Sequence, residues 1–173
     1  MPTVVLFNIH LILGYVTMLL CLGAYVLPRL RTMEAVAAQR IIATFHSFRF
    51  FGLVFILPGV IGPGLPESFG TFAAYGDFAT GVLAILALLT VRVRPLFWLL
   101  VVAFNVVGIF DLVLDYVHAI ALGVPAHAGE FGAAYVIPVL YVPALMITHV
   151  FAFYLLLRPR PQNAGAIAGG AVS

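Results

Sequence analysis

Long apolar runs recur along this chain and constrain its fold more than any other feature. A run of about 20 such residues crosses the hydrocarbon core of a bilayer as a helix. Five runs are present, spanning residues 3–27, 35–61, 72–91, 95–122 and 133–157. Proline and glycine separate most of them, as helix stop signals do. The sequence therefore predicts an all-α fold: an integral membrane bundle of five transmembrane helices.

The composition supports this class and excludes others. Of 173 residues, 64% are hydrophobic and 8% are charged, far less polar surface than a soluble domain of this length needs. Residues 1–158 are expected to form a single transmembrane domain, and residues 159–173, rich in Ala and Gly, a disordered cytoplasmic tail. A net charge of only +2 argues against nucleic acid as a partner. Cys21 is the only cysteine, which excludes an internal disulfide and cysteine-based metal sites.

Arginine placement predicts the orientation. All eight basic residues are Arg, and seven of them flank alternate connections or follow the last run: Arg29, Arg31, Arg40, Arg92, Arg94, Arg158 and Arg160. The other connections, around Glu67 and around His127 and Glu130, contain no Lys or Arg. By the positive-inside rule, the N-terminus lies outside and the C-terminus in the cytoplasm. We expect a multi-pass protein of the cell membrane, of the bacterial inner-membrane type.

Ionisable side chains inside the apolar runs are the candidate functional residues. A charge near the bilayer centre costs about 2.5–3.5 kcal/mol on insertion scales, so each should face protein, water or a partner. Asp111, Asp115 and His118 fall on one helical face. Arg49 lies too deep to reach water and keeps its proton, which predicts a contact with Asp111 at similar depth. That pair serves function or merely locks the bundle together.

The remaining candidates extend this polar core. His46 and His149 are expected at one depth, nearer the inner side, while Asp77, Asp115 and His118 are expected toward the outer side. His10 belongs to a stripe of small residues and should face protein. The predicted ligand- or proton-binding set is His46, Arg49, Asp77, Asn105, Asp111, Asp115, His118 and His149. The leading hypothesis is binding or translocation of a small molecule or of protons through this core.

Part of the chain resembles small multi-spanning bacterial membrane proteins of uncharacterised function. The resemblance rests on residues 104–112 and 137–143 followed by His149, and Arg49 and Gly76-Asp77 fit the same pattern loosely. It covers about the last two runs. That group brings no known activity, so the resemblance supports the fold and the choice of residues only.

Three alternatives stay open. Paired histidines, His46 with His149 and His10 with His118, predict two b-type haem sites, and that plan is similar to the cytochrome b561 group, whose ligands lie on four consecutive helices. His46-Ser47, Asp77 and His149 superficially resemble the zinc site of ceramidase-type and adiponectin-receptor-type hydrolases, although their His-x-x-x-His pair is missing here. A third reading is an accessory subunit of a larger membrane complex, and a homo-oligomer is also compatible with the sequence.

Overall fold

The computed structural model describes residues 1–158, and this part of the chain is helical, with no strand. The predicted tail, including Arg160, lies outside the described residues. The elements in order are α1 (Thr3–Cys21), the π-helical turn η1 (Leu22–Val26), α2 (Leu27–Thr32), α3 (Ala35–Ser47), the 3₁₀ segment η2 (Phe48–Ile56), α4 (Glu67–Leu89), α5 (Arg94–Ala121), the 3₁₀ segment η3 (Val124–Tyr135), the π-helical turn η4 (Ile137–Tyr141) and α6 (Val142–Leu157).

Four continuous helices in the described part are long and apolar enough to cross a membrane: Thr3–Thr32, Glu67–Leu89, Arg94–Ala121 and Ile137–Leu157. In length and composition they are the helices of a membrane protein, and the described part of the chain is all-helical. The run predicted at 35–61 differs from expectation, because it forms α3 and then the 3₁₀ segment η2, which ends at Ile56. It is therefore not one of the four uninterrupted spans.

Proline shapes two of the spans without ending them. Pro28 was expected to stop the first helix, yet the helix continues to Thr32 through η1. A proline lacks an N–H and its ring collides with the carbonyl four residues earlier, so a wider π-helical turn before it accommodates the ring. Pro138 lies in η4 and Pro143 at the start of α6, where the winding changes in the same way.

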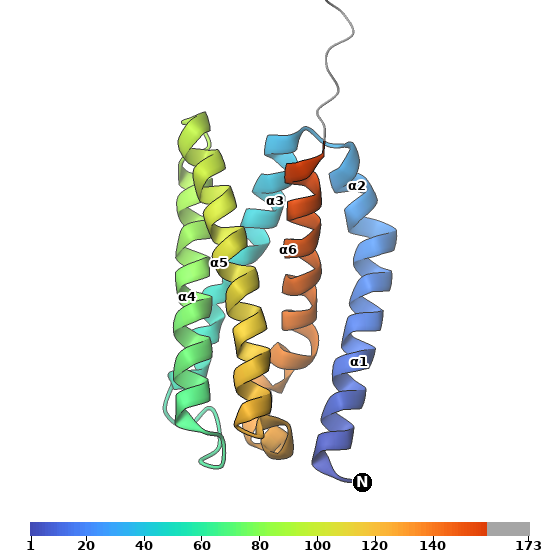
Figure 1. Ribbon diagram of the computed structural model, residues 1–173, viewed down its shortest axis with the longest axis vertical. Coiled ribbons are helices and arrows are strands. Elements are labelled where there is room, and N and C mark those ends of the chain that lie inside the picture. The colour runs from blue at the N-terminus through green and yellow to red at the C-terminus, as the bar shows by residue number, and fades with distance from the viewer. Residues whose placement is uncertain (159–173) are drawn as a thin grey trace, which may run out of the picture.

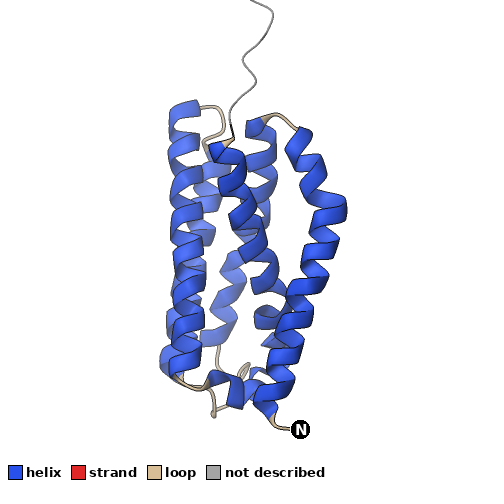
Figure 2. Ribbon diagram, turned by 45° about the vertical axis from the view of Figure 1, so that its right-hand side comes forward, coloured by secondary structure: helices blue, strands red, loops and turns tan. Residues whose placement is uncertain are grey.

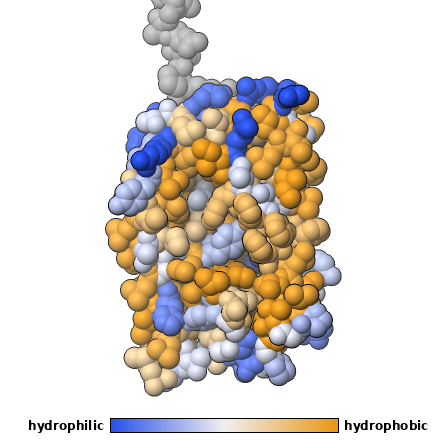
Figure 3. All heavy atoms as spheres, turned by 180° about the vertical axis from the view of Figure 1, so that it is seen from behind, coloured by the Kyte–Doolittle hydropathy of each residue, from blue (hydrophilic) through white to orange (hydrophobic). Residues whose placement is uncertain are grey.

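The helices run along one common direction, and their connections gather at two ends (Figure 1, Figure 2). The N-terminus lies at one end, together with the connection from η2 to α4 and with η3. The connections α2–α3 and α4–α5 and the end of α6 lie at the other end. Hydrophilic spheres gather at that second end in Figure 3, above sides that are largely hydrophobic. Arg29, Arg31, Arg92, Arg94 and Arg158 lie in or beside these connections or at the end of α6, so they share this end of the bundle.

Two apolar clusters fill the interior and leave a polar layer between them. One includes Ile42, Phe97 and Phe104, and the other includes Phe55, Phe69 and Phe131. Between them, α4 packs closely against η2 and α5 because its buried face is made largely of small side chains. That face comprises Phe69, Gly70, Ala73, Ala74, Asp77, Thr80, Gly81, Ala84 and Ala87. The single carboxylate among them marks the level of the polar layer.

Helix α1 lies at the edge of the bundle and is the least buried of the four spans. Its close approach is at Gly14, where an added Cβ would overlap the backbone oxygen of Val139 in η4. His10 was expected to face protein; its Nδ1 lies 2.8 Å from the hydroxyl of Tyr135 in η3, while much of the residue is exposed.

Candidate functional site

Arg49 is the centre of the polar layer and is completely buried, with 0% of its surface exposed. It lies in η2, whose 3₁₀ winding of about three residues per turn brings residues i, i+3 and i+6 to one face. The buried residues of this segment are Arg49, Gly52 and Phe55, which fits that spacing. The winding thus turns Arg49 toward α4 and α5 and away from lipid.

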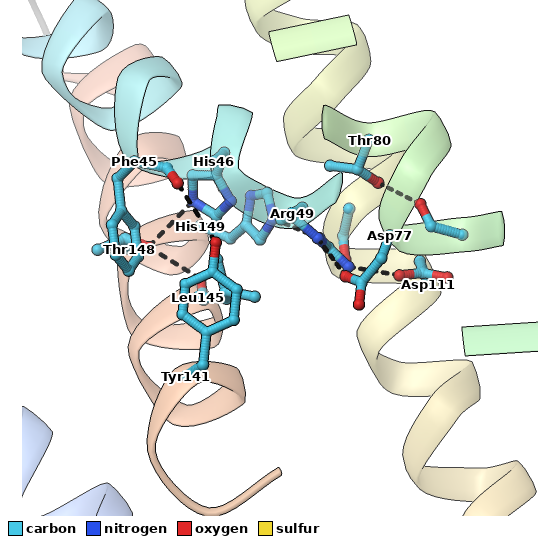
Figure 4. A network of polar contacts seen from close by, with 12 residues as sticks. Phe45, His46, Arg49, Asp77, Thr80, Asp111, Tyr141, Leu145, Thr148 and His149 are labelled. Carbon is cyan, nitrogen blue, oxygen red and sulfur yellow. Dashed lines mark hydrogen bonds and ion pairs between the residues drawn. The ribbon is translucent and has the colours of Figure 1, made fainter. Parts of the chain in front are cut away.

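Arg49 forms ion pairs with two carboxylates. Its Nε donates to Oδ1 of Asp77 in α4 at 2.7 Å, and its Nη2 donates to Oδ2 of Asp111 in α5 at 2.5 Å (Figure 4). Its Nη1 donates to the backbone oxygen of Gly108 at 3.2 Å. The predicted contact with Asp111 is present. With both carboxylates ionised, the cluster of Arg49, Asp77 and Asp111 carries a net charge of −1.

The depth predicted for Asp77 from the sequence is wrong. It was expected toward the outer side, because the third run was taken to begin at residue 72. Helix α4 instead begins at Glu67, directly after Pro66, which puts Asp77 ten residues into the helix. At about 1.5 Å per residue, this depth of about 15 Å is half of a bilayer core, level with Arg49.

Three glycines, one on each element of the cluster, leave space for its charged groups. A Cβ on Gly52 of η2 would lie 2.7 Å from Cγ of Asp77, and one on Gly76 of α4 would lie 2.5 Å from Cγ of Asp111. A Cβ on Gly108 of α5 would lie 2.7 Å from Nη1 of Arg49. Ordinary contact begins at 3.4 Å, so each glycine is required by the position of a charged neighbour. Sequence reasoning missed this role of the glycines.

His149 of α6 continues the network from Arg49. Nη1 of Arg49 lies 3.2 Å from Nε2 of His149, and Nδ1 of His149 lies 2.9 Å from Oδ1 of Asn105. Arginine only donates, so Nε2 accepts and the ring proton is on Nδ1, from which it is donated to Asn105. Nδ2 of Asn105 in turn donates to the backbone oxygen of Val101 at 2.8 Å, which fixes the amide orientation. Arg49 therefore selects one tautomer of His149.

His46 of α3 lies directly against His149, with ring centroids 3.8 Å apart, as their predicted common depth requires. Nε2 of His46 lies 3.0 Å from Oγ1 of Thr148, whose hydroxyl donates to the backbone oxygen of Ala144 at 2.8 Å. The hydroxyl therefore accepts from His46, which leaves Nδ1 of His46 as a buried acceptor without a hydrogen-bond partner. Thr148 is a further member of the site that sequence reasoning did not identify. Its position one residue before His149 was the available signal.

The histidine arrangement does not fit the alternative cofactors. Axial haem ligands lie on opposite faces of the macrocycle, whereas the rings of His46 and His149 are in direct contact, with centroids 3.8 Å apart and no space between them for a porphyrin. His10 and His118 have different partners: Nδ1 of His10 lies 2.8 Å from the hydroxyl of Tyr135, and His118 stacks on Phe72. In residues 1–158, no group of three or more His, Cys, Asp or Glu is placed to hold a metal ion.

Asp115 is half-buried and faces a partly open cavity beside the ion cluster. This cavity of about 140 Å³ lies between the cluster and the end of the bundle that holds the N-terminus. Asp77 is the other charged residue of that lining, and most of the wall is apolar or aromatic. Oδ1 of Asp115 is buried and has no hydrogen-bond partner. A site of this size holds several water molecules, each of which needs about 10–15 Å³.

His118 is separate from this cavity although it shares a helical face with Asp115. It lines a surface groove between α4 and α5, together with Glu67 and the edge of Asp111. The structure thus brings together His46, Arg49, Asp77, Asn105, Asp111 and His149, places Asp115 in the adjoining cavity, and leaves His118 and His10 outside.

The fold and the site together define a membrane protein with a buried ion cluster at its centre. The chain belongs to a family described as Domain of unknown function (DUF8737), which matches residues 6–157. No curated protein and no solved structure matches the chain. The family description names no activity, so the residues and geometry of the site are the guide to function.

Proposed function

We propose that this protein takes up protons, or a small cation that competes with them, in the cavity of Asp77 and Asp115 and passes them through its polar core. The observation that carries the proposal is a cavity, large enough for several water molecules, whose charged lining residues are two carboxylates. Such a lining selects a proton, a cation or another hydrogen-bond donor and repels anions.

The ion cluster adjoins this cavity through Asp77, a member of both. A single proton taken up by the cluster of Arg49, Asp77 and Asp111 brings its net charge from −1 to 0. A second proton leaves Arg49 buried without a carboxylate, which is strongly unfavourable. The cluster therefore accepts one proton per cycle, and that proton weakens one of the two ion pairs.

Polar groups continue from the cluster toward the end of the bundle that bears the arginines. His149 and His46 follow Arg49, and Gln39 lies two turns before His46 in α3. Nδ1 of His46 and Oε1 of Gln39 are both buried acceptors without a hydrogen-bond partner. Both can receive a hydrogen bond from a transient water, which extends the route through the inner half.

The proposal includes the five-span topology, with the N-terminus outside, in a bacterial-type inner membrane. The 13 residues of α3 and the nine of η2 rise about 38 Å together, because a 3₁₀ segment rises about 2 Å per residue and an α-helix about 1.5 Å. A bilayer core is about 30 Å thick, so this segment is long enough to cross it. The arginines at one end support the orientation.

Proton flux into proteoliposomes tests the function. Purified protein is reconstituted around a pH-sensitive dye, and a potassium gradient with valinomycin sets the membrane potential. Wild type should acidify the lumen faster than empty vesicles, and Asp115→Asn should reduce the rate at least tenfold. Glu67→Gln is the matched control, because Glu67 is an exposed carboxylate outside the cavity. A wild type that matches empty vesicles, or an Asp115→Asn variant that matches wild type, refutes the proposal.

Cysteine labelling tests the topology. In a Cys21→Ser background, Thr32→Cys and Ser68→Cys flank the segment of α3 and η2. If this segment crosses the bilayer, a membrane-impermeant maleimide added to intact cells labels position 68 and spares position 32. Equal labelling of both positions shows that the segment does not cross.

A further inference from the structure

A second candidate site lies at the opposite end of the bundle from the cavity. A groove of about 920 Å³, here called the basic groove, opens between the α2–α3 connection, the start of α5 and the end of α6. Its charged residues are Arg31, Arg94, Arg158 and Glu34, which give a net charge of +2. The proposed function uses none of them.

Two of these arginines are held in place. Nη1 of Arg158 donates to the backbone oxygen of Arg31 at 2.8 Å, and the guanidinium of Arg31 lies over the ring of Tyr154, 5.8 Å from its centroid. The first contact satisfies a carbonyl at the C-terminal end of α2 and links that helix to α6. The guanidinium groups of both arginines are therefore held at the groove and do not extend freely into solvent.

Helix ends of both polarities meet at the basic groove: the N-terminal ends of α3 and α5, and the C-terminal ends of α2 and α6, where Arg31 and Arg158 supply compensating positive charge. Ala35 and Val36, the first residues of α3, line it, and so does Arg94, the first residue of α5. The N-terminus of a helix presents backbone N–H groups and a partial positive charge to an anion. Arginine side chains and helix N-termini together are the donors that phosphate prefers.

The rest of the lining is apolar. Leu30, Val36, Ala38 and Leu155 form walls beneath the charged rim, and Trp98 lies beside them. Tryptophan is typical of the headgroup level of a membrane. A free phosphate ion has no apolar part that could contact such walls. A phospholipid combines an anionic headgroup with acyl chains that would cover them.

We propose that the basic groove binds the headgroup phosphate of an anionic phospholipid, with one acyl chain along the apolar wall. The inference depends on the membrane setting and not on proton uptake. Basic pockets between transmembrane helices on the inner side are suited to such lipids. Binding would join α2, α5 and α6 at the end where the connections are short.

The chain supplies its own probe, because Trp98 is its single tryptophan. The full protein is placed in nanodiscs of phosphatidylcholine with increasing phosphatidylglycerol, and one of the two lipids carries brominated acyl chains that quench tryptophan on contact. Brominated phosphatidylglycerol should reach half-maximal quenching at a mole fraction about fivefold or more below that of brominated phosphatidylcholine. Equal quenching by both lipids overturns the proposal.

Arginine variants distinguish lipid binding in the groove from a general effect of surface charge. Arg94→Gln and Arg158→Gln should each reduce the preference for phosphatidylglycerol about fivefold, since one arginine near an anionic surface contributes roughly that factor. Arg40→Gln is the control, because Arg40 is exposed in α3 but does not line the groove. Arg94→Lys keeps the charge and should retain most of the preference. An equal loss in Arg40→Gln, or no loss in the double variant Arg94→Gln/Arg158→Gln, refutes the groove as the site.

Inorganic phosphate distinguishes the headgroup from the free ion. At 10-fold excess over the lipid it should leave the quenching by brominated phosphatidylglycerol unchanged, because it cannot occupy the apolar wall. Complete displacement would show a phosphate site and not a lipid site. Far-UV circular dichroism of each variant confirms that the helices are intact.

Discussion

Replacement of Gly76 by alanine tests whether the ion cluster depends on the space around it. The new Cβ would lie 2.5 Å from Cγ of Asp111, about 0.9 Å inside the 3.4 Å at which ordinary contact begins. Asp111 would have to move, and Arg49 holds it on its other side. Separating a buried ion pair costs about 3–5 kcal/mol. The higher helix propensity of alanine relative to glycine offsets about 1 kcal/mol of this loss.

The expected net effect is a loss of about 2–4 kcal/mol in the free energy of unfolding. It is measured by titrating dodecyl sulfate into detergent micelles and following far-UV circular dichroism. Gly23→Ala is the matched control, since a Cβ there meets nothing within 4 Å, and it should be neutral or stabilise by up to about 1 kcal/mol.

A second comparison assigns the loss to Asp111. In an Asp111→Ala background the atoms that the new Cβ meets are gone, so Gly76→Ala should cost much less than in wild type. If Gly76→Ala and Gly23→Ala have equal stability in the wild-type background, Asp111 is free to move and the cluster is not a fixed structure.

Three further predictions concern the network and the edge of the bundle. Arg49→Gln should lower the free energy of unfolding more than Asp77→Asn or Asp111→Asn in the same titration. It leaves two buried carboxylates without a cation, which costs about 3–5 kcal/mol. Equal losses in all three variants would argue against the cluster. Nitrogen-15 spectra of histidine-labelled protein should show His149 protonated on Nδ1 and His46 on Nε2, and Asn105→Ala should alter the His149 signals alone; a His149 proton on Nε2 is incompatible with the Arg49 contact. Gly14→Ala should lower the free energy of unfolding by about 1–3 kcal/mol, since its Cβ overlaps the backbone of Val139, whereas the exposed Cys21→Ala should change it little.

The sequence predicted much of this architecture because hydropathy and helix stop signals are local. The run at 95–122 corresponds to α5, Arg94–Ala121, within one residue at each end. The contact of Arg49 with Asp111 followed from depth and charge alone. A buried arginine in an apolar setting needs a carboxylate, and few were available.

Other features depended on packing that a single sequence does not reveal. The 3₁₀ winding of η2 is not distinguishable from an α-helix by apolar periodicity over nine residues. It is favoured by the close approach of η2 to α4, where a Cβ on Gly81 would lie 3.2 Å from the backbone nitrogen of Phe50. The place of Asp77 was missed because the third run was taken to begin at residue 72, whereas α4 begins at Glu67. The role of Gly76, which makes room for Asp111, was missed as well.

The ion cluster also bears on how the chain is made. In the proposed five-span topology, Arg49 leaves the ribosome 28 residues before Asp77 and 62 residues before Asp111. At about 5–20 residues per second, the second carboxylate follows roughly 3–12 s later. During that interval the arginine side chain must be kept out of the hydrocarbon, either in the insertion machinery or at the membrane surface. Chains truncated after α4 should therefore be unstable in the membrane, and the arrival of α5 should commit the earlier segments to their final places.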